Sequence, residues 1–248
     1  MRKHLSVLSL WWSMSWRLLL GVTVGMALGE GLYFAWSWQS LAGTGEFSLD
    51  RLLSPMGRSA FIGFLLLFAS LTGLGFQRRS RVQYTLDRLR VRPESAAMWH
   101  WACIALCLLI LWAAQAAILL ALCAVYRHLA DPALLSEQTV FLAVYRLDCL
   151  HQLLPLEAVS GWVRNAAVGL ALSLAGAWAA YRQRQKSKLP YILVILLASV
   201  TWGGNLYQNT SEPYRDLVFI LFSLLAILIL LLFLNLKEGG SEDDAEDA

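Results

Sequence analysis

The stretch WACIALCLLILWAAQAAILLALCAV, residues 101–125, decides the fold class of this chain. It carries no formal charge, and Gln115 is its one side-chain amide. About 20 apolar residues, rising 1.5 Å each along a helix, cross the hydrocarbon core of a bilayer. A single segment in lipid must satisfy its backbone hydrogen bonds internally, so a segment of this kind spans as a helix. The stretch therefore predicts a transmembrane helix.

Five further apolar segments flank this one, and their predicted bounds are 18–38, 59–76, 163–181, 191–207 and 217–236. The chain has 248 residues, of which 58% are hydrophobic, and the longest connection between spans is 126–162. These connections are too short for a separate soluble domain. The sequence predicts an all-α, polytopic membrane protein with one transmembrane domain, residues 1–236. This class excludes most soluble enzymes.

The basic residues separate by connection, which predicts the orientation. Fourteen of the 20 lie on one side of a six-span arrangement, and six lie on the other. Cytoplasmic loops carry the excess of lysine and arginine, so both termini are expected inside the cell. The distribution of the basic residues thus indicates the topology. The net charge of +3 is not a sign of nucleic-acid binding, and no nucleic-acid partner is expected. The outer six are Arg51, Arg58, Arg127, Arg146, Arg164 and Arg215.

Three segments outside the spans have their own character. Residues 5–16 place tryptophans at helical spacing and favour an N-terminal interfacial helix, although one tilted helix continuous with the first span also fits. Residues 139–154 predict an outer amphipathic helix, because their charges oppose a crossing. The tail, residues 237–248, is acidic and glycine-containing, which predicts disorder on the cytoplasmic side.

No catalytic or metal-binding motif occurs. The chain lacks a phosphate-binding Gly-x4-Gly-Lys-Ser/Thr loop, a His-Glu-x-x-His pair and a Gly-x-Ser-x-Gly elbow. Cys103 and Cys107 share a helix face, but two thiols without further ligands make a poor metal site. The four histidines occur singly, at positions expected to face water or the interface. We therefore expect no enzyme activity, no metal and no cofactor in this chain.

Glu30 is the one acid predicted deep within a span. Such a residue usually faces the interior of the bundle and has a partner. One reading is a functional acid that gates a path or contacts a substrate. Another is a structural acid that joins the first span to a neighbour through Gln115 or Asn205. A third places it near the outer interface.

Gly21, Gly25 and Gly29 recur every four residues in the same span. Small residues at this spacing allow another helix to approach closely. Packing within the bundle and packing across a dimer explain the pattern equally well.

The connection after the second span is rich in arginine. Gln77-Arg78-Arg79-Ser80-Arg81 marks the inner surface, and residues 82–97 predict a short amphipathic helix interrupted at Pro93. Arg88, Arg90 and Arg92 exceed what anchoring requires. They fit an acidic groove on a cytoplasmic partner, or anionic lipid headgroups.

The order of parts resembles the membrane subunit of an ATP-binding-cassette transporter of the type-2 exporter class. In that family the stretch after span two often reads T-L-x-x-L-P-V-S-R and forms a coupling helix. Thr85, Leu86, Leu89, Val91 and Arg92 match in kind. Arg90 stands where the pattern has proline, and Pro93 comes later. The family also often carries its long outer segment between spans five and six, whereas here it lies between spans three and four.

The resemblance implies a permease in the cell membrane, most simply the bacterial cytoplasmic membrane. It implies a homodimer, or a heterodimer with a similar subunit, and a separate ATPase subunit that binds ATP. The docking residues it implies are Thr85, Leu86, Arg88, Leu89, Arg90, Arg92 and Glu94. A membrane-embedded enzyme and a regulatory or scaffold protein that transports nothing are the alternatives.

Overall fold

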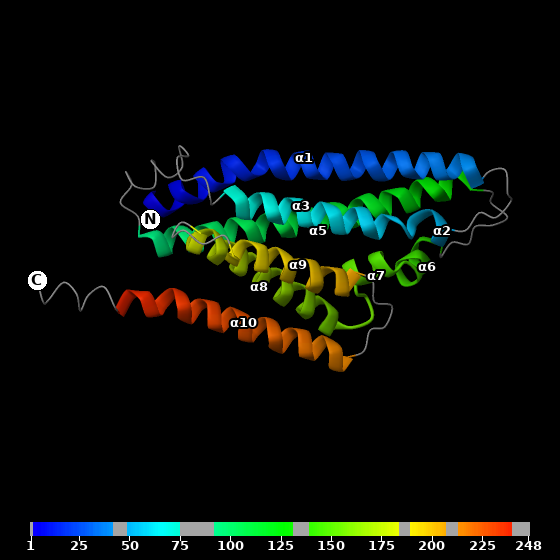
Figure 1. Ribbon diagram of the computed structural model, residues 1–248. Helices are drawn as coiled ribbons and strands as arrows, with labels where there is room; N and C mark the ends of the chain where they lie inside the picture. The colour runs from blue at the N-terminus through cyan, green and yellow to red at the C-terminus, as the bar shows by residue number, and fades with distance from the viewer. Residues whose placement is uncertain are drawn as a thin grey trace, which may run out of the picture.

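The computed structural model describes residues 2–41, 49–74, 92–130, 139–183, 189–206 and 213–239, and over these residues its secondary structure is helical (Figure 1). The long helices are α1 (Arg2–Leu41), α3 (Met56–Leu74), α5 (Pro93–Leu129), α8 (Val159–Gln183), α9 (Leu189–Leu206) and α10 (Pro213–Gly239). The short helices are α2 (Leu49–Leu53), α6 (Thr139–Arg146) and α7 (Asp148–Leu153). The all-α prediction is confirmed for this part of the chain.

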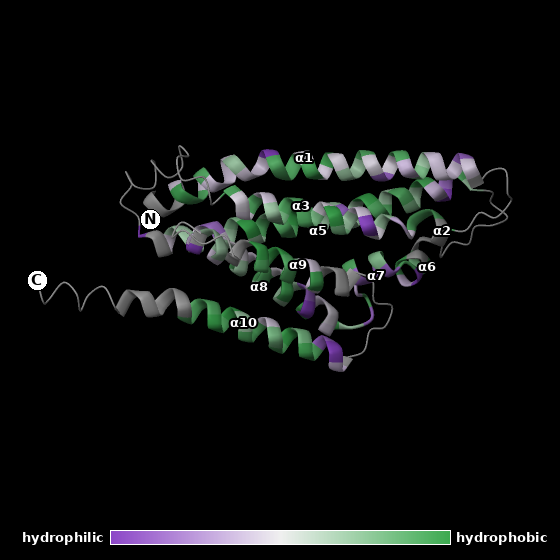
Figure 2. Cartoon of the chain, in the orientation of Figure 1, coloured by the Kyte–Doolittle hydropathy of each residue, from purple (hydrophilic) through white to green (hydrophobic). Residues whose placement is uncertain are grey.

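Five of these helices are long and apolar enough to cross a membrane. The candidate spans are Ser6–Ser40, Met56–Leu74, Ser95–Leu129, Val159–Arg182 and Tyr214–Leu232, in α1, α3, α5, α8 and α10. Helix α9 contains a shorter apolar stretch, Ile192–Thr201. Figure 2 shows the same character, since α10 is hydrophobic along most of its coloured length and hydrophilic at its first turn. The structure is thus consistent with a multi-pass membrane protein.

The long helices run side by side and alternate in direction (Figure 1). The start of α1 and the end of α10 lie at one end of the bundle, which we call the terminal end. The helices α2, α6 and α7 lie at the opposite end, which we call the short-helix end. Helix α1 packs against α5 and α3, whereas α10 packs against α8.

Helical periodicity in the sequence builds the core. On α3, Phe64, Leu67, Phe68 and Leu71 are buried at intervals of three and four residues. Helix α8 approaches α3 closely because Gly176 has no side chain: a Cβ there would lie 2.9 Å from Oγ1 of Thr72 and 3.0 Å from the ring of Phe68. Small residues of this kind let helices pack without large side chains between their backbones.

The prediction of a separate N-terminal interfacial helix is wrong. Residues 5–16 belong to α1, which continues without a break to Leu41. No proline or glycine interrupts the chain before Gly21, so the helical hydrogen bonds simply continue. At 1.5 Å per residue, this 40-residue helix is about 60 Å long, roughly twice the thickness of a hydrocarbon core.

Other predicted bounds also shift. Residues 82–91 of the predicted coupling helix lie outside the described residues, and residues 93–97 belong to α5, because Pro93 starts that helix. The predicted outer helix 139–154 is two short helices, α6 and α7, separated at Leu147. Helix α10 extends to Gly239 and so includes the first residues of the predicted tail, while residues 240–248 lie outside the described part.

The glycine repeat on α1 has no neighbour within the described part of the bundle. A Cβ added at Gly21, Gly25 or Gly29 would meet nothing within 4 Å. Leu28 and Leu32, on the same outward side of the helix, are also exposed. Of the two explanations for the repeat, packing within the bundle is therefore wrong for the described residues. What remains is contact with lipid or with a second molecule.

Candidate functional site

Two clusters of buried polar side chains lie towards the short-helix end of the bundle. The first, the Glu30 cluster, consists of Glu30 on α1, Ser59 on α3 and Gln115 on α5. The second, the Arg164 cluster, consists of Ser160, Arg164 and Asn165 on α8, Asp216 on α10, and Gln152 on α7. Polar groups removed from water cost free energy unless they are paired, so each cluster requires an account of its partners.

Glu30 is 1% exposed, and its Oε1 accepts two hydrogen bonds. Nε2 of Gln115 donates one across 2.7 Å, and the hydroxyl of Ser59 donates the other. The Ser59 oxygen also lies 2.8 Å from the carbonyl oxygen of Met56, in its own helix. Oε2 of Glu30 and Oε1 of Gln115 are buried and have no hydrogen-bond partner among the residues that the structure describes. The predicted link between Glu30 and Gln115 is thus confirmed, while the side chain of Asn205 lies outside the described part.

The neighbours of Glu30 place it near one end of α3. Ser59 lies in the first turn of α3, a helix of 19 residues and therefore about 28 Å long. That length is close to the thickness of the hydrocarbon core. Glu30 is level with the start of α3, which favours the interpretation that it lies near one boundary of the apolar layer.

The Arg164 cluster is built around an ion pair, and further hydrogen bonds pair both of the charged side chains. NH1 of Arg164 lies 2.7 Å from Oδ1 of Asp216, and the two side chains are 4% and 5% exposed. NH2 of Arg164 donates to Oε1 of Gln152 across 2.6 Å. The second carboxylate oxygen of Asp216 accepts from the hydroxyl of Ser160 at 2.8 Å. Asn165 completes the cluster by donating from Nδ2 to the carbonyl oxygen of Gln152 at 2.7 Å.

The sequence interpretation missed this ion pair. A signal was present: an arginine and an aspartate each lie near the start of an apolar segment, and the predicted topology places both on the outer side. Charged residues at membrane depth usually pair with each other. What the sequence lacks is the information that α8 and α10 are neighbours.

Helix α7 belongs to the Arg164 cluster and also packs against the first turn of α3, which carries Ser59. Its Gln152 binds Arg164, while its Cys149 packs against Gly57 at the start of α3, where an added Cβ would lie 3.4 Å from Cβ of Cys149. Burial is the largest cause that raises the pKa of the Cys149 thiol from its ordinary 9.0 to about 12. The thiol is therefore neutral at physiological pH and is a poor nucleophile.

At the terminal end, His100 is buried rather than facing water as predicted. It is 3% exposed and stacks on Trp11, with the ring centroids 4.1 Å apart. Its Nε2 lies 3.2 Å from the carbonyl oxygen of Leu71. The packing of α1, α3 and α5 against one another covers it, which no local sequence pattern reveals.

The docking residues implied by the resemblance fall mostly outside the described part. Thr85, Leu86, Arg88, Leu89 and Arg90 lie there. Arg92 is exposed and directly precedes α5, and Glu94 belongs to the first turn of α5. The start of α5 lies at the terminal end of the bundle (Figure 1). Both residues are therefore far from the Glu30 cluster.

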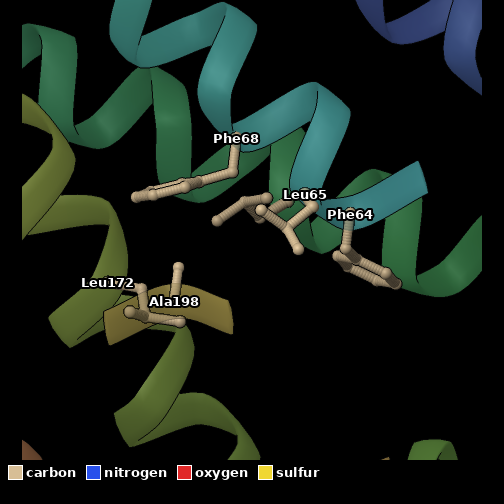
Figure 3. Close-up of a pocket in the computed structure, with 6 residues that line it drawn as sticks. Phe64, Leu65, Phe68, Leu172 and Ala198 are labelled. Carbon is tan, nitrogen blue, oxygen red and sulfur yellow. The ribbon is translucent and has the colours of Figure 1, made fainter. Parts of the chain in front are cut away.

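A pocket lies between four of the long helices, and its lining is apolar. Figure 3 shows side chains of α3, α8 and α9 pointing toward it. The lining residues are Phe64, Leu65, Phe68, Leu108, Leu172 and Ala198. Among the residues the structure describes, no group of three or more histidine, cysteine or acidic side chains could hold a metal ion.

Comparison with protein-family models found no matching family, and comparisons with curated proteins and with solved structures found no match.

Proposed function

We propose that this chain is the permease subunit of an ATP-driven transporter of the ATP-binding-cassette class, acting as an exporter. In this proposal six helices cross the membrane, with α9 as the sixth crossing and both termini in the cytoplasm. The membrane is the cytoplasmic membrane of a bacterium. The chain itself is not an enzyme and holds no cofactor, because the partner ATPase binds ATP.

The observation that carries the proposal is that the start of α1, the end of α3, the start of α5 and the end of α10 lie at the same, terminal end of the bundle (Figure 1). The arginine-rich connection joins the end of α3 to the start of α5. The excess of basic residues assigns that end to the cytoplasm. A soluble ATPase subunit could therefore reach this connection. The proposed docking residues are Thr85, Leu86, Arg88, Leu89, Arg90, Arg92 and Glu94.

Transporters of this class work with two permease subunits, so the proposal includes a homodimer or a heterodimer with a similar chain. The outward side of α1, with Gly21, Gly25 and Gly29, is available for such a contact. Closure of the ATPase dimer on ATP would push the docking connection and tilt α3 and α5, which it joins.

Affinity purification of the tagged, detergent-solubilised protein, followed by mass spectrometry, tests the proposal. We expect a stoichiometric ATPase of the cassette class in the eluate. The variant Leu86→Asp/Leu89→Asp should lose this ATPase. The variant Ser241→Asp/Ala245→Asp adds the same charge to the acidic tail and should keep it. If no ATPase is recovered from the parent protein at any detergent strength, the proposal is wrong.

A further inference from the structure

The Glu30 cluster contains more hydrogen-bond acceptors than donors. A hydroxyl has one hydrogen, so Ser59 can donate either to Glu30 or to the carbonyl oxygen of Met56, but not to both at once. Gln115 donates once to Oε1 of Glu30. Oε2 of Glu30 and Oε1 of Gln115 then remain as buried acceptors without a donor. A buried acceptor that stays unpaired is unfavourable, because it has lost its hydrogen bonds to water.

No described cation compensates Glu30. Arg58 is next to Ser59 in the chain, but its side chain is exposed and forms no ion pair with Glu30. The thiol of Cys149, on α7, is neutral and supplies no positive charge. From α5 the group that reaches Glu30 is the amide of Gln115. An isolated carboxylate buried this completely is strongly unfavourable, and such a group normally takes up a proton.

We propose that Glu30 is a proton-binding site: it holds a proton on Oε2 as a neutral carboxylic acid and shares that proton with the side-chain oxygen of Gln115. One hydrogen then serves both of the unpaired acceptors. Oε1, which already accepts from Gln115 and Ser59, is the carbonyl oxygen of the acid. Acid and amide would face each other as a doubly hydrogen-bonded pair that joins α1 to α5.

Glu30 requires a proton whichever way the amide of Gln115 is turned. With oxygen and nitrogen exchanged, the amide oxygen would face Oε1 of Glu30, and two acceptors would meet. The proton of Glu30 would then lie on Oε1 instead of Oε2. The inference is also independent of the proposed transporter function, since it concerns the state of the carboxyl group alone.

Infrared spectroscopy of the full chain in detergent at pH 7 tests the proposal directly. A protonated carboxyl group has a C=O stretching band that is separate from the amide bands and shifts in D2O. We expect this band in the parent protein and its loss in Glu30→Gln. The control Glu157→Gln removes an exposed acid and should leave the band in place. In Gln115→Leu the band should remain but shift to higher frequency, because its hydrogen bonds are lost.

Labelling with dicyclohexylcarbodiimide provides a second measurement. The O–H of a neutral acid adds across a C=N bond of this apolar reagent, the proton passes to nitrogen, and no group leaves. Peptide mass spectrometry should find the adduct at Glu30 at least tenfold more often than at Asp216, which is buried but paired with Arg164. Equal or greater labelling of Asp216 would overturn the proposal. Absence of the infrared band in the parent protein would overturn it alone, since that measurement needs no reagent to reach the site.

Discussion

Helices α1 and α10 each carry one buried acidic side chain into the bundle, and the partners of the two side chains differ in kind. Asp216 of α10 is paired with an arginine and a hydroxyl, so each of its carboxylate oxygens has a donor. Glu30 of α1 faces an amide and a hydroxyl, and one of its oxygens has no donor. Both acids are almost fully buried. The difference shows that burial alone does not determine the charge of an acid; its partners do.

The two clusters should therefore respond differently to substitution. An ion pair depends on both charges, because either one alone is strongly unfavourable when buried. A neutral acid–amide pair depends on hydrogen bonds and should tolerate a neutral side chain of the same shape. Substitutions in and around each cluster test this contrast.

Arg164→Ala should have the largest effect. It leaves Asp216 buried without its cation, which should lower the free energy of unfolding by about 3–5 kcal/mol. The double variant Arg164→Met/Asp216→Leu removes both charges and should recover most of this loss. Tryptophan fluorescence during thermal unfolding in one detergent measures both. Equal destabilisation in the single and double variants would show that the ion pair is not what the site requires.

Glu30→Ala should be less severe. It removes the acceptor of the Gln115 and Ser59 hydrogen bonds and leaves a cavity, at a cost of about 2–3 kcal/mol. Glu30→Gln keeps the shape and a neutral side chain, so it should cost about 1 kcal/mol or less. The same unfolding measurement compares the two variants. A Glu30→Gln protein as unstable as Glu30→Ala would mean that the negative charge itself is needed, contrary to the contrast with Asp216.

Gly63→Val tests the contact that brings Glu30 to its partners. A Cβ at Gly63 would lie 2.1 Å from Sδ of Met26 on α1, so α1 and α3 must separate or Met26 must move. Overpacking of this kind should cost about 1–2 kcal/mol. Gly25→Val on the outward side of α1 is the matched control, since nothing lies within 4 Å of a Cβ there. If the control is equally destabilised in detergent, the outward side of α1 is itself a packed interface.

Cys149 should report the smallest disturbances, because α7 contacts the Arg164 cluster through Gln152 and packs against Gly57, two residues before Ser59. Burial raises the pKa of its thiol from an ordinary 9.0 to about 12, so the folded protein retains the thiol proton where the unfolded chain loses it. The resulting contribution to stability is complete below pH 9 and is lost as the pH rises from 9 toward 12. At pH 8, alkylation by N-ethylmaleimide should be slow in the folded protein and fast after unfolding.

The same labelling distinguishes the clusters. Arg164→Ala and Glu30→Ala should each speed the alkylation of Cys149, whereas Glu30→Gln should not. Peptide mass spectrometry measures the rate at this cysteine separately from Cys103, Cys107 and Cys123. Rapid alkylation of Cys149 in the folded parent protein would contradict its burial.

Much of the fold could be predicted from residues taken one segment at a time. The stretch 101–125 forms a helix within α5, and the apolar segments around it also lie in helices. The errors lie where a boundary depends on context. Residues 5–16 have a recognisable amphipathic pattern, but nothing in them ends a helix, so α1 continues through them. Pro93 starts α5, whereas the local periodicity predicts a short helix over residues 82–97 that Pro93 interrupts.

The residues of the candidate site also differ in how far the sequence predicts them. Glu30 can be recognised from the sequence because an acid within an apolar segment is unfavourable. The sequence offers Gln115 and Asn205 as its partners. Arg164 and Asp216 did not stand out as a pair, because they are 52 residues apart. Their link depends on which helices are neighbours. His100 was misplaced for the same reason.

By itself, the sequence determined that this chain forms long apolar helices, because a run of uncharged apolar residues in lipid has no other way to satisfy its backbone. It also determined at which positions a charged side chain is unfavourable, namely within the apolar segments. The partners come from the tertiary structure: Asp216 of α10 is paired with an arginine from α8, and Glu30 of α1 is paired with an amide from α5. Partner choice depends on helix packing, which sums many weak contacts across distant segments and leaves little trace in any one of them.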